Sequence, residues 1–243
     1  MMIRVCLVLL TALVIAAPLG ARPPVRHSVI TPAKATDWSK IASATAAGGF
    51  VMGNPAAKVK LVEYGSLTCS HCRHFDGEGV TPLIADYVRS GKVSWEFRSF
   101  LRNGFDIPAT LTASCNGAAS FFPLLRALYA AQPDWVAKMQ AIPADRLEAI
   151  RKLSPPQQFA AIGEAAGFPV FAAAHGVPAG KIGACLSSEA AAKKLAQGTA
   201  DAANTDHVNG TPTFMVNGVK LDYSGASSVW GAVKARLDAA LRG

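Results

Sequence analysis

Two cysteines separated by two residues form the most chemically informative feature of this sequence. Cys69 and Cys72 lie in the segment LTCSHC, with Ser70 and His71 between them. An apolar run, VKLVEYG at residues 59–65, comes just before it, and apolar residues at helical spacing follow it. The pattern predicts a strand, a tight turn and a helix, with Cys69 at the helix N-terminus and Cys72 one turn inside.

A thiol in that position is suited to thiol–disulfide exchange. Unpaired backbone N–H groups and the positive end of the helix dipole favour the thiolate of Cys69. His71 can add positive charge or a hydrogen-bond donor. Cys69 would then form a mixed disulfide with a substrate, and Cys72 would resolve it.

Metal and haem sites are the competing interpretations of the same stretch. His71 and His74 lie among the cysteines, but no second, separated ligand pair of the kind that completes a structural zinc site exists. A c-type haem site needs histidine directly after the second cysteine, and residue 73 is arginine. We therefore expect no metal and no cofactor.

Composition sets the size and broad class of the protein. The 243 residues are 51% hydrophobic and only 16% charged, enough for one sizeable core, or for one core and a subsidiary domain. The net charge of +8 comes from scattered Lys and Arg with no aromatic-interleaved basic stripe. We expect no nucleic-acid partner.

Residues 1–21 have the pattern of a secretory signal. Arg4 precedes an apolar run too short to span a membrane, and small residues lead to a plausible cleavage site after Ala21. The prediction is a periplasmic or secreted protein; retention of the signal as an anchor is the alternative.

The cysteine count then gains meaning. Cleavage would remove Cys6 and leave four of the five cysteines. An even count in an exported chain implies disulfides. With Cys69 and Cys72 as a local pair, the other bond would be Cys115–Cys185; two unpaired buried thiols are the alternative.

After the signal, composition and hydrophobic pattern divide the chain into four parts. An arm or linker is expected first, then a β-α-β unit, then an Ala-rich helical insertion, and finally a hairpin with a last helix. Asn217-Gly218 is a strong hairpin-turn signal. The boundaries are residues 22–48 for the arm, 49–105 and 207–243 for the α/β domain, and 106–206 for the insertion. Insertion helices are expected over residues 108–131, 135–140, 144–153, 155–166 and 188–204.

Glu63 interrupts the apolar strand before the cysteines. A lone acid in a buried strand is costly unless it has a partner or a chemical role. An acid at a strand end that reaches water explains the pattern equally well, so the residues alone leave both interpretations open.

Taken together, these features resemble the DsbA-like branch of the thioredoxin superfamily. CSHC follows the strand VKLVEYG, a helical block interrupts the chain after the β-α-β unit, and GTPTF leads into the hairpin. The resemblance covers residues 49–243 and implies an α/β thioredoxin fold with a helical insertion between its β-α-β and β-β-α parts.

The resemblance also implies roles for single residues. Cys69 matches the nucleophile and Cys72 the resolving cysteine, while Ser70 and His71 match the pair that tunes the reduction potential. Three further matches lie outside this centre. They are Pro212 as the cis-proline facing the cysteines, Thr211 as the residue whose backbone pairs with an extended substrate, and Glu63 as the buried acid that assists proton transfer.

The implied activity is the introduction of disulfides into unfolded or reduced exported proteins. A membrane partner, such as a quinone-linked oxidase, would reoxidise the pair, and the chain would act as a monomer because no N-terminal dimerisation domain is evident. Ser70 and Thr211 depart from the proline and valine common in the strongest oxidants. They keep open a reductase or isomerase with a membrane reductase as partner. A chaperone-like or metal-holding module without turnover is a further alternative.

Overall fold

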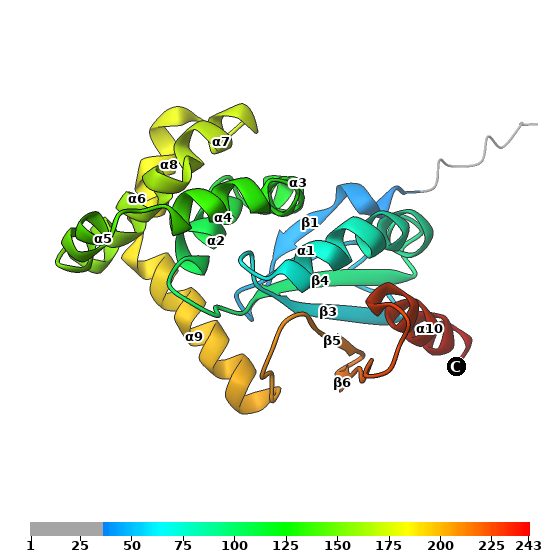
Figure 1. Cartoon of the computed structure of the whole chain (residues 1–243). Helices are drawn as coiled ribbons and strands as arrows, with labels where there is room; N and C mark the ends of the chain where they lie inside the picture. Colours follow the sequence, from blue (N-terminus) through cyan, green and yellow to red (C-terminus); the bar gives the residue numbers. More distant parts are fainter. Residues whose placement is uncertain (1–35) are drawn as a thin grey trace, which may run out of the picture. The chain divides into compact units, whose positions relative to one another are not determined.

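A six-stranded sheet forms the centre of residues 36–243, the part of the chain that the computed structural model describes (Figure 1). The predicted signal and the first part of the predicted arm, residues 22–35, lie outside the described residues. The strand order is β1-β2-β4-β3-β5-β6; β3 and β4 are parallel, and the other neighbouring pairs are antiparallel. The strands are β1 (Ala42–Ala44), β2 (Phe50–Met52), β3 (Val59–Gly65), β4 (Val93–Ser99), β5 (Thr213–Val216) and β6 (Val219–Lys220).

The central strand β3 has apolar residues on both faces because both faces are covered. Leu61 joins the main core, whereas Val62 and Tyr64 pack in a second cluster on the opposite face. Side chains alternate between the faces of a strand. Glu63 therefore points to the same face as Leu61, the face covered by the cysteine-bearing helix.

That helix begins as α1 (Ser70–Phe75) and continues through two π-type segments, Asp76–Val80 and Leu83–Val88. Pro82, which has no N–H to donate, lies between the two segments. The C-terminal helix α10 (Val229–Arg242) packs on β5, β3 and the first π-type segment.

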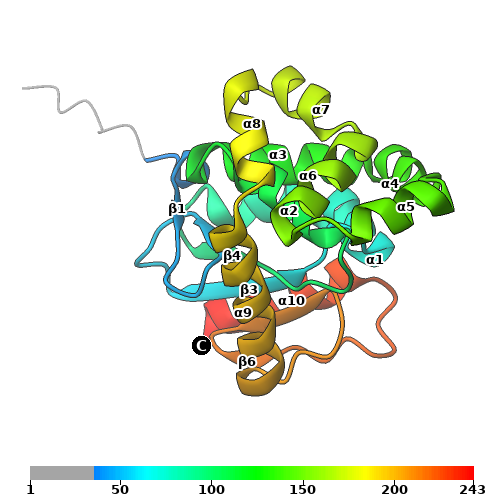
Figure 2. The ribbon, with the colours of Figure 1, turned by 90° about the vertical axis from the view of Figure 1, so that its left-hand side faces the viewer.

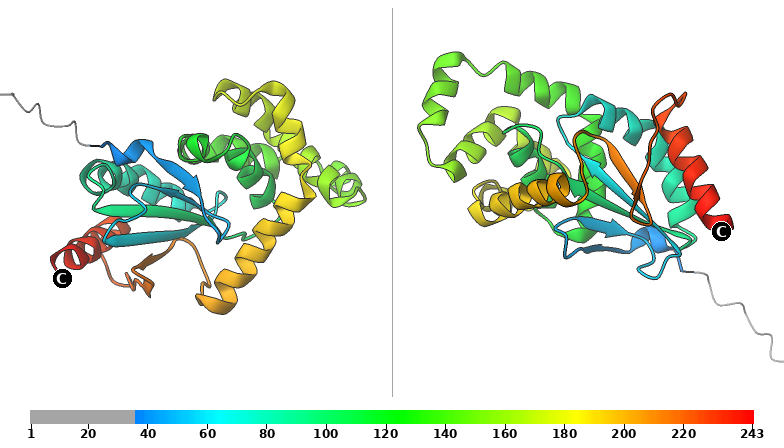
Figure 3. Two further views of the ribbon diagram at one scale, coloured as in Figure 1. Left: turned by 180° about the vertical axis from the view of Figure 1, so that it is seen from behind. Right: turned by 90° about the horizontal axis from the view of Figure 1, so that it is seen from below.

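A helical insertion lies between β4 and β5, as predicted. It occupies the end of the sheet at which β3 and β4 terminate (Figure 1). Its last helix, α9, returns the chain to the sheet beside β4 (Figure 2, Figure 3). The helices are α2 (Asp106–Ser114), α3 (Ala118–Ala130), α4 (Gln132–Gln140), α5 (Ala144–Arg151), α6 (Pro155–Ala166), α7 (Phe168–Ala174), α8 (Ala179–Leu186) and α9 (Glu189–Thr205).

Two details of the insertion differ from the sequence-based expectation. The single helix expected over residues 108–131 is two helices, because Gly117 adopts a left-handed backbone (φ 78°) between α2 and α3. The short helices α7 and α8 were not predicted. Each is flanked by glycine and proline, which read as turns in the sequence.

The described part of the predicted arm packs against the α/β domain. Residues 42–44 form β1, which pairs with β2 at the edge of the sheet. Trp38 packs so closely on Gly91 that a Cβ there would lie 2.6 Å from the indole ring. The sequence did not predict β1 because a three-residue edge strand with largely exposed side chains has no alternating hydrophobic pattern. Within residues 36–243, no helix is long and apolar enough to cross a membrane.

Candidate active site

The loop between β3 and α1 delivers both cysteines to the end of the sheet. Cys69 is the N-cap residue of α1, with extended backbone dihedrals (φ −85°, ψ 119°). Its carbonyl accepts the first hydrogen bond of the helix, from the Arg73 N–H at 3.1 Å. Cys72 lies one turn further on. Both side chains are buried, with 2% and 0% exposure, and both thiols are free.

The environments of the two thiols drive their pKa values apart. The pKa of Cys69 is lowered to about 4, first by a hydrogen bond from Cys72 and further by the Thr211 side chain and the backbone N–H groups of Cys72 and His71. Burial raises the pKa of Cys72 well above its ordinary value, and the hydrogen bond with Cys69 adds to the rise. Cys69 is thus the thiolate of the pair and Cys72 the thiol.

Thr211 and Pro212 lie directly beside Cys69. The peptide bond between them is cis. In its protonated form, the Cys69 thiol donates to the Thr211 carbonyl at 3.3 Å. The Tyr223 hydroxyl donates to the Pro212 carbonyl on the other side. The structure therefore brings these two residues, which lie far along the chain, to the cysteine pair.

Glu63 lies behind the pair, inside the protein. Its side chain is 1% exposed, and one carboxylate oxygen accepts from the Trp95 indole N–H at 3.1 Å. Burial raises the pKa of Glu63 to about 8, with a smaller contribution from the Asp76 carboxylate. The charge of Glu63 in turn raises the pKa of Cys72. Of the two interpretations of this acid, the structure therefore supports the buried one.

Ser70 and His71, the residues between the cysteines, are exposed on the first turn of α1. His71 stabilises the Cys69 thiolate through its backbone N–H. His74 pairs with Glu78 at 2.9 Å, on the exposed side of the helix. No cluster of three or more metal-ligating side chains occurs among residues 36–243.

Sequence reasoning missed a second buried acid next to the pair. Asp76 follows α1 directly and is 8% exposed. Burial raises the pKa of Asp76 to about 6, and Arg126, whose Nε lies 3.5 Å from the carboxylate, opposes the rise. An aspartate one turn after Cys72 in an otherwise apolar helix face was the signal that could have indicated it.

Sequence reasoning also missed the side chains with which the insertion holds the cysteine loop. The fully buried Asp106 carboxylate accepts from the Ser66 hydroxyl at 2.8 Å and the Thr68 N–H at 2.9 Å. The Tyr129 hydroxyl donates to the Ser66 carbonyl at 3.2 Å. Such long-range contacts leave no local pattern in the sequence.

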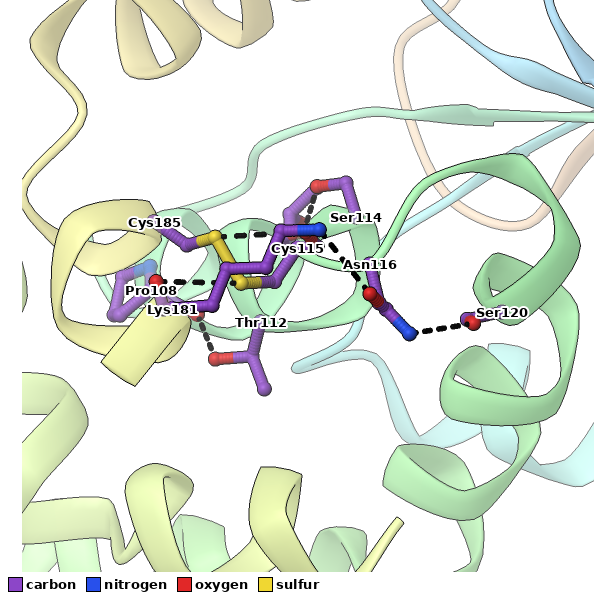
Figure 4. The surroundings of a disulfide bond; sticks show 9 residues. Pro108, Thr112, Ser114, Cys115, Asn116, Ser120, Lys181 and Cys185 are labelled. Carbon is purple, nitrogen blue, oxygen red and sulfur yellow. Dashed lines mark hydrogen bonds between the residues drawn. A yellow bond between two sulfur atoms is a disulfide. The ribbon is translucent and has the colours of Figure 1, made fainter. Parts of the chain in front are cut away.

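The remaining two cysteines form a disulfide inside the insertion. Cys115, at the end of α2, is joined to Cys185 of α8, with 5.5 Å between their Cα atoms (Figure 4). The bond is thus the pairing that the cysteine count favours, and it fastens two helices of the insertion together.

Fold and site together define a class of protein: a thioredoxin fold that presents a CxxC pair at a helix N-terminus, opposite a cis-proline. Comparison with known families agrees, since a thioredoxin family model matches residues 45–235. Among solved structures, a protein-disulfide isomerase from Novosphingobium aromaticivorans is 34% identical with a TM-score of 0.71, covering 79% of this chain and 97% of that one.

Two more distant relatives are similar in fold or in sequence. Wolbachia pipientis alpha-DsbA1 is 18% identical and shares the fold with a TM-score of 0.64, covering 82% of this chain and 94% of that one. A putative protein-disulfide oxidoreductase of Rickettsia felis is 28% identical, over 77% of this chain and 60% of that protein. The chain thus spans about three fifths of the length of the curated relatives it matches. The chain belongs to the thioredoxin family, and it shares its fold with the DsbA-like proteins.

Proposed function

We propose that the protein is a thiol–disulfide oxidoreductase that works as a disulfide donor to exported proteins. The observation that carries this proposal is the contrast between the two thiols of one CxxC pair. The pKa of Cys69 is lowered to about 4, whereas that of Cys72 is raised well above its ordinary value. Stabilising the Cys69 thiolate stabilises the reduced pair, and a stabilised reduced form makes the disulfide more oxidising.

The exchange has two steps. A substrate thiolate attacks Sγ of Cys69 in the 69–72 disulfide, forming a mixed disulfide and expelling Cys72 as a thiolate. Because its pKa is high, Cys72 takes up a proton, and Glu63 is the buried acid available to supply it. A second substrate thiolate then attacks the substrate sulfur of the mixed disulfide and expels Cys69 as a stable thiolate. Two electrons pass from the substrate to the pair.

Substrate recognition would use the backbone beside the cis-proline. The Thr211–Pro212 segment lies against Cys69 and can pair with the main chain of an extended substrate. We propose reduced, unfolded exported chains as substrates and a monomeric enzyme in the periplasm or outside the cell. A membrane oxidase linked to quinone would return the pair to the disulfide.

A second candidate, an isomerase, has its own support. The relative from Novosphingobium is described as a protein-disulfide isomerase, and Ser70 and Thr211 depart from the residues common in strong oxidants. An isomerase or reductase would rest in the reduced state, kept there by a membrane reductase. The resting redox state in the cell separates the two candidates.

The first experiment is equilibration of the 69–72 pair with glutathione buffers. A potential near about −120 mV supports a disulfide donor, and one near about −270 mV, as in thioredoxin, overturns that direction. Turnover on a reduced, unfolded two-cysteine protein is measured in parallel. Cys69→Ser should abolish oxidation of this substrate. Cys72→Ser should accumulate a mixed disulfide with the oxidised form of the same protein, because Cys69 attacks its disulfide and expels the other sulfur as a thiolate. Oxidation by Cys69→Ser at the wild-type rate would refute the assignment.

A further inference from the structure

One side chain of the insertion contacts the nucleophilic residue itself. Gln132, the first residue of α4, is 5% exposed. Its Nε2 donates to the Leu67 carbonyl at 2.6 Å and to the Cys69 carbonyl at 3.0 Å. Carbonyl oxygens only accept hydrogen bonds, so the amide nitrogen of Gln132 must face them, and both of its N–H groups are used.

The position of these two carbonyls gives the contact its importance. The Cys69 carbonyl also accepts the Arg73 N–H at 3.1 Å, the first hydrogen bond of α1. Gln132 therefore fixes the backbone at the residue where the loop becomes the helix. The orientation of that peptide decides whether Sγ of Cys69 faces the N–H groups of His71 and Cys72.

We propose that Gln132 is a positioning residue for Cys69, through which the helical insertion sets the reactivity of the redox pair. Asp106 and Tyr129 hold the preceding residues of the loop from two other helices. Gln132 alone among these three side chains bonds to the nucleophile's own peptide. Its consequence for catalysis rests on the proposed function, but its effect on the thiolate does not.

Removing the donor has a predictable direction. Two buried carbonyls would lose a partner, and the loop would shift to find another. Any such shift moves Cys69 away from the donors that stabilise its thiolate. The thiolate then forms at higher pH, and the equilibrium with glutathione moves toward a less oxidising disulfide.

Trp135, one turn further along α4, offers a matched control. It is 3% exposed, and its indole N–H donates to the Leu128 carbonyl at 2.8 Å, away from the cysteine loop. Trp135→Phe therefore removes a buried side-chain-to-backbone hydrogen bond from the same helix. It should lower stability without altering the cysteine pair.

The experiment titrates the Cys69 thiolate by its ultraviolet absorbance in the reduced full chain and measures the equilibrium constant with glutathione. Gln132→Met keeps the size of the side chain, and Gln132→Asn keeps the amide but withdraws it by one methylene. Either variant should raise the titration midpoint and shift the equilibrium constant about threefold to tenfold, as one lost buried hydrogen bond implies. Trp135→Phe should change neither quantity.

A Gln132 variant that loses stability but titrates like Trp135→Phe would overturn the proposal. If neither Gln132 variant folds while Trp135→Phe does, the role of Gln132 is structural and the proposal fails as well. Failure of the proposed function would look different: the wild-type protein would not oxidise its substrate, while the thiolate titrations could still differ between variants.

Discussion

The two cysteine pairs of this chain lie at opposite ends of helices. Cys69 is the N-cap residue of α1, where the backbone N–H groups of Cys72 and His71 help to lower the pKa of its thiol. Cys115 follows the last residue of α2, and Cys185 lies in the last turn of α8. Both members of the second pair thus sit near helix C-termini, where the dipole disfavours a negative charge.

This difference in position separates a reactive pair from a structural one. Exchange at a disulfide needs a leaving thiolate, and a thiol of low pKa leaves faster. Cys69 meets that need, and the pair at the helix C-termini does not. The second bond instead links residues 70 positions apart and fastens two helices of the insertion. The residue type is the same in both pairs, and the surrounding backbone decides the chemistry.

The largest expected effect that tests this comparison is the pH dependence of stability in the reduced protein. The pKa of Cys69 is about 4 in the fold against an ordinary 9.0. The stability that the Cys69 thiolate contributes is therefore fully present above about pH 9 and is lost as the pH falls through about 4. Between these two pH values, the free energy of unfolding of the reduced protein should increase with pH. Relative to Cys69→Ser, the increase should be up to about 1.4 kcal/mol per pH unit.

Urea unfolding at a series of pH values measures this difference. Glu63 acts in the opposite direction, since its raised pKa gives stability below about 4.5 that is lost as the pH rises through about 8. Because both proteins keep Glu63, its contribution largely cancels. If the free energies of unfolding of the wild type and of Cys69→Ser changed in parallel with pH, the fold would not stabilise the Cys69 thiolate. The proposed difference between the two cysteine pairs would then be wrong.

Much of this comparison was accessible from the sequence. The apolar run of β3, the CxxC after it and the Asn217-Gly218 turn each carry a local pattern, and the structure has the predicted elements there. Both Asn217 and Gly218 have positive φ, as the predicted turn requires. The insertion appeared as a change from strand to Ala-rich helical texture.

What the sequence did not indicate is how the insertion reaches the redox pair. Asp106, Tyr129 and Gln132 contact the loop at residues 66–69 from positions about 40 to 65 residues later. Each is an ordinary polar residue in a helical segment until the chain folds. The edge strand β1 was missed for the related reason that backbone pairing, and no side-chain period, holds it in place.

The second expected effect concerns the structural disulfide. Replacing both cysteines, Cys115→Ala with Cys185→Ala, removes a link across 70 residues of sequence. The oxidised protein should lose about 2–4 kcal/mol of unfolding free energy, since the unfolded chain regains the freedom that the link removed. The titration midpoint of Cys69 should not move. A shift of that midpoint would mean that the two pairs are coupled through the insertion.

The smallest expected effect concerns the acid behind the reactive pair. Glu63→Gln keeps the size of the side chain and an acceptor for the Trp95 indole N–H. At neutral pH the carboxyl is largely protonated, because burial raises its pKa to about 8. It can therefore give a proton to Cys72 as that thiolate leaves, and the amide cannot.

Oxidation of a substrate thiol by the Glu63→Gln variant, followed by stopped flow, should be slower by about tenfold near pH 7. This is below the usual contribution of general acid–base catalysis because thiolates leave readily. The rate should also lose its dependence on a group titrating near pH 8. Glu96→Gln is the control. Glu96 lies on the neighbouring strand β4, one residue before Phe97, which pairs with Glu63 in the sheet. Its carboxylate accepts from the Arg98 guanidinium at 2.9 Å. An unchanged rate for Glu63→Gln would mean that no buried proton donor takes part in the exchange. The reactive pair would then differ from the structural pair only in its position at a helix N-terminus.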